Sequence, residues 1–148
     1  MLGVTKFAKR ERSQRGNALV EFSLLAPWLL FLFVGVFDMG FYTYSMTAVE
    51  NAARVAAEFT SSSPTNATKT AVACTRVLGE LSMLPNMKNV SSCTCSPLEL
   101  NVASGAGPDS LPATSVTVTY SGVRLIPIPG LLTGQLNFSR TVQMRIKP

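Results

Sequence analysis

The residue that most needs a chemical explanation is Glu21, because it lies inside an otherwise apolar run. Leu19 to Phe37 is apolar apart from Glu21, Ser23 and Pro27, and Asp38 closes the run. A carboxylate in such a segment is costly unless it is paired with a cation or extends to the membrane surface. Glu21 therefore indicates either a buried ion pair or a side chain that reaches an interface.

Three cysteines form the second group that could carry chemistry. Cys74, Cys93 and Cys95 all follow the apolar run. An extracytoplasmic location permits disulfides, and Cys93 and Cys95 are too close in sequence to bridge each other without strain. We expect Cys74 to pair with one of them, which leaves one thiol. Metal binding would need a fourth ligand, and the chain has no histidine, so we predict no metal site.

The composition argues against catalysis and against nucleic-acid binding. Histidine is the commonest general base, and the chain has none. Nothing in the sequence pairs a nucleophile with a base, so we predict neither an enzyme nor a cofactor. The net charge of +5 is concentrated in residues 1–16, which carry five basic residues and one acidic residue. Residues 17–148 carry a net charge of only +1, so no basic nucleic-acid surface is expected.

The elements that must position Glu21 begin with a membrane span. Ala18 to Phe37 has 20 residues, about 30 Å as a helix, which is the thickness of one bilayer core. The basic leader predicts a cytoplasmic N-terminus and an extracytoplasmic part after Asp38. A cleavable secretory signal peptide is the rival interpretation, but no small-x-small site directly follows the run.

The helix should continue beyond the membrane. Apolar residues recur there at spacings of three and four, with Glu50 and Arg54 on the opposite face. We expect Met46, Val49 and Ala53 to be buried. One helix should therefore run from Ala18 to about Thr60, with a kink near Pro27, which removes a backbone donor.

After this helix, the sequence predicts a second helix and a small sheet. Ser63 and Pro64 are typical of a helix start, and Pro85 ends a pattern that buries one face from about Pro64 to Met83. The residues expected on that face are Ala67, Ala71, Cys74, Leu78 and Leu81. Period-two alternation in 98–102, 115–120 and 135–146 predicts three antiparallel strands, with a turn at 105–109. The fold class is therefore α+β.

The segment 123–132 is very apolar for a loop, and its prolines forbid a central strand. Two alternatives remain open for it. It either folds back over the sheet or forms an exposed contact patch for another subunit.

The stretch Arg15-Gly16-Asn17-Ala18-Leu19-Val20-Glu21-Phe22 resembles the processing motif of type IV prepilins. It is most similar to the TadE-like family, minor pilins (pseudopilins) of tight-adherence (Tad/Flp) pilus systems. The shared plan is a leader, a glycine, four residues, a glutamate, an aromatic residue and an apolar helix. The resemblance extends to the C-terminal strands and is weak in residues 60–110. Phe22 stands where major pilins usually have tyrosine, which favours a minor subunit.

The resemblance implies a division into three parts and a set of partners. Residues 1–16 would be a prepilin leader, 17–38 a transmembrane and assembly helix, and 39–148 an extracytoplasmic α+β domain. A prepilin peptidase would cut between Gly16 and Asn17, and Glu21 would then pair with the new α-amino group of a neighbouring subunit. The implied partners are this peptidase, other pilin subunits, an inner-membrane assembly platform and lipid.

The expected function is therefore pilus initiation, assembly or adhesion, by a protein that starts in the inner membrane and reaches the pilus or cell surface. The alternative is an unprocessed, single-pass, membrane-anchored extracytoplasmic binding module. The mass of the mature protein distinguishes the two, because processing removes the 16 residues of the leader.

Overall fold

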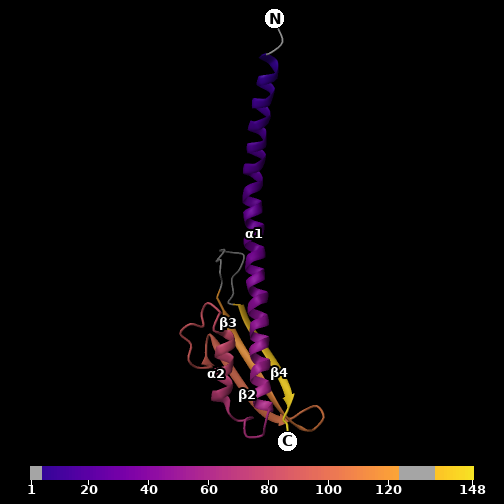
Figure 1. The fold of residues 1–148 in the computed structure, drawn as a ribbon, viewed down its shortest axis with the longest axis vertical. Coiled ribbons are helices and arrows are strands. Elements are labelled where there is room, and N and C mark those ends of the chain that lie inside the picture. Colours follow the sequence, from indigo (N-terminus) through magenta and orange to yellow (C-terminus); the bar gives the residue numbers. More distant parts are fainter. Residues whose placement is uncertain (1–4, 124–135) are drawn as a thin grey trace. The chain divides into compact units, whose positions relative to one another are not determined.

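The structure is a computed structural model that describes residues 5–123 and 136–148. Two helices precede four strands in the described chain (Figure 1). The chain divides into two compact units, Met1–Met39 and Gly40–Pro148. The α+β class is as predicted, and the core described below belongs to the second unit.

Helix α1 runs without interruption from Thr5 to Ser61. The predicted helix from Ala18 to about Thr60 is therefore confirmed, and α1 begins 13 residues earlier. Neither Pro27 nor Gly40 ends the helix. The helix is continuous because the apolar run before Asp38 and the amphipathic segment after it share the helical period.

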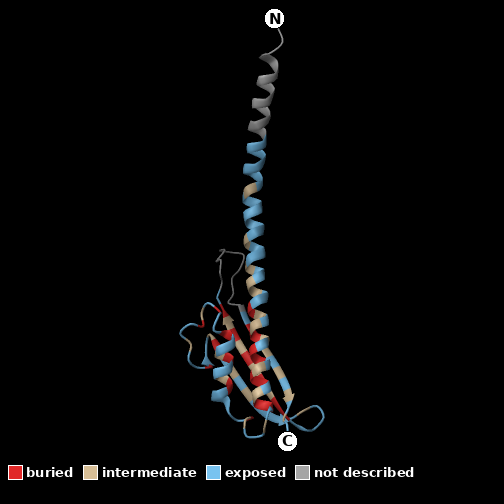
Figure 2. Ribbon diagram, viewed as in Figure 1, coloured by how far each residue is buried: buried red, intermediate tan, exposed pale blue. Residues whose placement is uncertain are grey.

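The second half of α1 buries a narrow face of small side chains. Val49, Ala53 and Ala57 are fully buried, as are Ala52 and Ala56. Val49 and Ala53 were expected there, whereas Met46 is only half-buried. Alanine side chains allow a helix backbone to approach its neighbour closely, which is why this segment packs without large side chains. Figure 2 shows the buried residues of the second unit gathered on α1, α2 and the sheet.

Helix α2 spans Thr70–Leu81, so the predicted start at Pro64 is wrong. Residues 64–68 form turns instead, held by bonds such as that from Asn66 N to Ser63 O, 3.0 Å. Ser63 makes no helix cap; its hydroxyl lies 3.0 Å from that of Thr65. Short polar side chains in this segment offer the backbone local alternatives to helical bonding.

The buried face of α2 is also rotated from the predicted one. Ala73, Val77 and Leu81 are buried, while Ala71, which was expected in the core, is exposed. Cys74 and Leu78 are partly buried beside them. Two overlapping apolar stripes fit this sequence, and packing against α1 and the sheet selects one of them.

The sheet has four antiparallel strands, so the prediction of three is wrong. They are β1 (Thr94–Cys95), β2 (Leu98–Ala106), β3 (Pro112–Gly122) and β4 (Leu136–Arg145), in the spatial order β1-β2-β3-β4. β1 is only two residues long and pairs Thr94 with Glu99 and Cys95 with Leu98. Two residues are too few for an alternating pattern, which is why the sequence did not reveal this strand.

The β2–β3 hairpin extends further than predicted, and its turn moves accordingly. β2 continues to Ala106, and Gly107 N donates to Leu111 O at 2.7 Å. Ser110 has a φ of 61°, the left-handed conformation that a tight turn requires. The predicted turn at 105–109 therefore lies two residues further along the chain.

One face of the sheet is apolar and covered by the helices. Leu98, Val118 and Tyr120 are fully buried on it. α1 contacts this face along its second half: the Tyr42 and Phe138 rings lie 4.8 Å apart, and Thr114 Oγ1 donates to Thr60 Oγ1 at 3.2 Å. The opposite face carries hydroxyl pairs, such as Thr117 with Thr141 at 2.8 Å.

Candidate functional site

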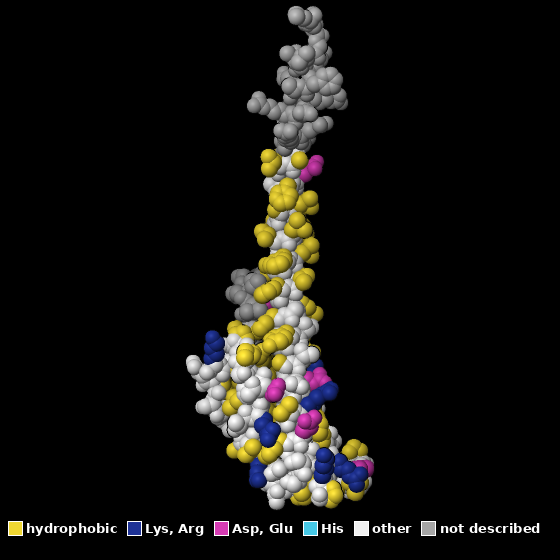
Figure 3. All heavy atoms as spheres, in the orientation of Figure 1, with side chains coloured by type: hydrophobic (Ala, Val, Ile, Leu, Met, Phe, Trp, Pro, Cys, Tyr) yellow, Lys and Arg dark blue, Asp and Glu magenta, His cyan; other side chains and the backbone are white. Residues whose placement is uncertain are grey.

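The apolar part of α1 carries the candidate assembly residues. Glu21 lies on the exposed surface of the helix, and Phe22 beside it is 65% exposed. Large apolar side chains from Leu19 to Phe37 are likewise exposed, and Figure 3 shows them following one another along the helix. This helix is long and apolar enough to cross a membrane. Such a surface is stable only in lipid or against other apolar helices.

Glu21 therefore has a specific electrostatic requirement. Within the described residues, no hydrogen bond or ion pair is formed by its carboxylate. The apolar segment that follows supplies no cation, because the first basic residue after Arg15 is Arg54. A counter-charge in a dry environment must come from outside this segment.

Gly16 and Asn17, the predicted processing site, both lie within α1. Glycine is a poor helix former, about 1 kcal/mol less favourable than alanine in a helix interior. Local opening of the helix at Gly16 therefore costs about that much less than it would at an alanine.

Pro27 lies within α1, and the helix continues on both sides of it. The proline has no N–H to donate to the carbonyl oxygen of Ser23, four residues earlier. The Ser23 hydroxyl donates to Val20 O at 2.8 Å. The kink expected near Pro27 stays a prediction.

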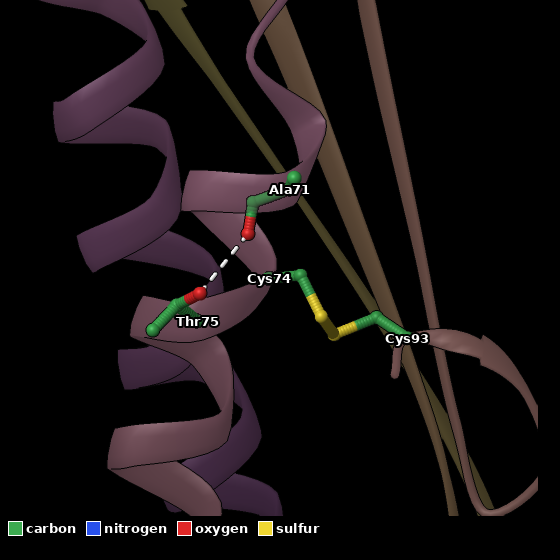
Figure 4. Close-up of a disulfide and its surroundings, with 4 residues drawn as sticks. All are labelled: Ala71, Cys74, Thr75 and Cys93. Carbon is green, nitrogen blue, oxygen red and sulfur yellow. Dashed lines mark hydrogen bonds between the residues drawn. A yellow bond between two sulfur atoms is a disulfide. The ribbon is translucent and has the colours of Figure 1, made fainter. Parts of the chain in front are cut away.

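The cysteines lie in the second unit, where Cys74 of α2 is bonded to Cys93. Figure 4 shows this disulfide joining the helix to the segment just before β1. Cys95 is a free, exposed thiol. The sequence left open whether Cys74 pairs with Cys93 or with Cys95. The structure has the pairing with Cys93, which is buried and only 5% exposed.

A polar pair in the core was not foreseen from the sequence. The Tyr120 hydroxyl donates to Asn86 Oδ1, and Asn86 Nδ2 donates to Ser121 O at 2.8 Å. Burial raises the pKa of the Tyr120 phenol, and the hydrogen bond to Asn86 partly opposes that rise. Asn86 thereby ties the connection after α2 to β3. Nothing in the local pattern distinguishes Asn86 from the other polar residues of its segment.

The apolar segment 123–132 lies outside the described residues except for Val123, which is 42% exposed. Both alternatives for it therefore stay predictions. Among residues 18–123 and 137–148, whose side chains the structure describes, no group of three or more histidine, cysteine, aspartate or glutamate residues is placed to hold a metal ion.

Comparison with known proteins finds one family. Residues 16–58 match the family model described as TadE-like protein. The matched segment begins at the predicted processing glycine and ends within the last turn of α1, so the whole match lies on this helix. The TadE-like family is associated with Tad pilus systems. No curated protein and no solved structure matches the chain significantly.

Proposed function

We propose that this chain, whose residues 16–58 are TadE-like, is a minor pilin of a Tad (Flp) pilus system. A prepilin peptidase cuts it between Gly16 and Asn17. The observation that carries the proposal is the arrangement along α1. Gly16, Asn17 and Glu21 stand in that order before an uncovered apolar segment, and the same helix continues into a folded α+β unit.

Cleavage gives Glu21 a partner. It creates a new α-amino group at Asn17, and a neighbouring subunit presents that cation to the carboxylate when apolar helices bundle. The pair fixes the axial register between subunits, because either charge left alone in an apolar bundle is costly. The exposed apolar side chains around Glu21 supply the rest of the contact.

The protein then acts in pilus initiation, assembly or adhesion and performs no catalysis. It starts as a single-pass inner-membrane protein with its leader in the cytoplasm and unit Gly40–Pro148 outside. Its partners are the peptidase, other pilin subunits, the assembly platform and membrane lipid. No nucleic acid and no cofactor takes part.

The test is the mass and N-terminal sequence of the full chain, expressed together with the prepilin peptidase of its own system. We expect loss of the 16 leader residues and a mature protein that begins at Asn17. Gly16→Leu should block the cut, because the peptidase must fit a small residue beside the scissile bond.

Gly35→Leu is the matched control, because a Cβ added at Gly35 meets no atom within 4 Å. This variant should be cut like the wild type. A dominant species that begins at Met1 in the wild type would contradict the pilin proposal and favour the unprocessed, membrane-anchored binding module.

A further inference from the structure

In the second unit, β3 runs antiparallel to the part of α1 that packs on it. Thr114, near the start of β3, bonds to Thr60 of α1 at 3.2 Å. Tyr120, near the end of β3, is paired with Phe138, whose ring lies 4.8 Å from that of Tyr42. The end of β3 therefore lies where α1 enters this unit, and we call this end of the unit the Tyr42 end.

The Tyr42 end presents uncharged side chains to its surroundings. Val123, the residue after β3, is 42% exposed, and Tyr44 of α1 is 54% exposed. The segments of α1, β3 and β4 that form this end contain no charged residue; they are residues 40–47, 120–123 and 136–138. Moving these segments out of water would therefore leave no buried charge without a partner, which is the largest cost of such a transfer.

A membrane lies within reach of this end because α1 is continuous. Gly40 follows Phe37, the last residue of the apolar run, by three positions in the same helix, which is about 5 Å. The headgroup layer on one side of a bilayer is about 5–8 Å thick. When the apolar run spans the hydrocarbon core, this end of the unit is therefore at the level of the headgroups. Val123, three residues beyond Tyr120, extends up to about 10 Å further in that direction.

We propose that the Tyr42 end of the folded unit rests on the lipid headgroups with Val123 inserted among them, so that the chain has a second membrane contact beside its span. Tyrosine is enriched at membrane–water interfaces, and exposed apolar side chains gain free energy by leaving water there. Val123 also begins the apolar segment 123–132, whose composition suits the same boundary. This proposal rests on the membrane span of the proposed function and does not depend on processing at Gly16.

The experiment measures quenching of tryptophan fluorescence by nitroxide-labelled lipids, with the full-length chain in phosphatidylcholine vesicles. Trp28 is the single tryptophan of the chain and lies at the centre of the apolar run, so it reports on the span itself. We expect a nitroxide deep in the acyl chain to quench Trp28 more strongly than a nitroxide on the headgroup.

Three further reporters are introduced one at a time in chains that carry Trp28→Phe, each with an unchanged circular dichroism spectrum. Val123→Trp should lose fluorescence to the headgroup nitroxide and lose less to the deep one. Tyr44→Trp keeps an aromatic ring and should show the same order. Leu111→Trp is the matched control, because Leu111 is also an exposed apolar residue but lies just before the start of β3, at the opposite end of that strand. Neither nitroxide should quench it.

Three results would overturn the proposal. If Trp28 is quenched in the wild type but Val123→Trp is no more quenched than Leu111→Trp, the span is inserted and the Tyr42 end stands clear of the lipid. A blue-shifted emission of Val123→Trp without quenching would instead place this end against another protein subunit. Absence of quenching of Trp28 would contradict the membrane span of the proposed function, and this proposal with it.

Discussion

At the scale of single residues, glutamate has different roles at different positions of this chain. Glu50 is neutralised within α1 by Arg54, at a distance of 2.7 Å and on an exposed surface, where such a pair contributes little. Glu21 lies on the same helix in apolar surroundings with no described partner. The difference in setting, and not the residue type, is what makes Glu21 a candidate for contact between subunits.

We predict that Glu21→Leu impairs assembly without impairing insertion. The substitution makes the span more apolar, so membrane insertion should be as good as in the wild type. It also leaves the α-amino group of the incoming subunit unpaired, and breaking one side of a buried pair costs roughly 3–5 kcal/mol. The measurement is the amount of the subunit in sheared filaments relative to its membrane pool. We expect a fall of orders of magnitude.

Ser23→Leu is the control for the added apolar surface, since the Ser23 hydroxyl bonds only within its own helix. It should enter filaments normally. If the Glu21→Leu protein is processed and enters filaments at wild-type levels, Glu21 has no pairing role and simply extends to the membrane surface.

At the scale of elements, the second unit is held together by contacts between segments distant in sequence. α2 is linked to α1 by the hydrogen bond from Asn51 to Glu80 and by Arg76 over the Phe59 ring. It is linked to the start of the sheet by the Cys74–Cys93 disulfide. Because α2 has only 12 residues and no side-chain cap, its position depends on these links more than on its own helical stability.

The disulfide should therefore be a main source of stability for this unit. It closes a loop with a sequence separation of 19, and such a loop predicts about 3 kcal/mol from the lowered entropy of the unfolded chain. We expect the double variant Cys74→Ser, Cys93→Ser to lose about that much in urea-induced unfolding.

Cys95→Ser is the matched variant, because Cys95 is exposed and forms no disulfide. Its unfolding midpoint should equal that of the wild type. Equal midpoints for the double variant and the wild type would show that the bond is dispensable for this fold.

At the scale of the whole molecule, the chain combines one helix able to span a membrane with one folded α+β unit. Five basic residues precede the span, and all three cysteines follow it. This order predicts a single topology, with the leader in the cytoplasm and the unit Gly40–Pro148 outside.

The exposed thiol of Cys95 provides a native reporter of that topology. We expect a membrane-impermeant maleimide to label the wild-type chain in intact spheroplasts, and Cys95→Ser to abolish the labelling. Labelling that appears only after the membrane is permeabilised would place the folded unit in the cytoplasm and contradict both the orientation and the proposed function.

The sequence by itself determined the features that depend on neighbouring residues. The length and composition of the apolar run predicted the span, a shared helical period predicted the continuous helix through Asp38, and alternation predicted three of the four strands. The candidate residues Gly16, Asn17 and Glu21 were also recognisable, because their meaning comes from spacing along one helix.

The tertiary structure decided what depends on residues far apart in the chain. The two-residue strand β1 exists only through its pairing with β2, and the choice of Cys93 over Cys95 depends on which cysteine faces α2. The start of α2 at Thr70 reflects turns that compete locally with the helix. Arg140 of β4 lines a groove with Glu50 and Glu58, which come from a helix more than 80 residues earlier in the chain. No local pattern encodes that approach.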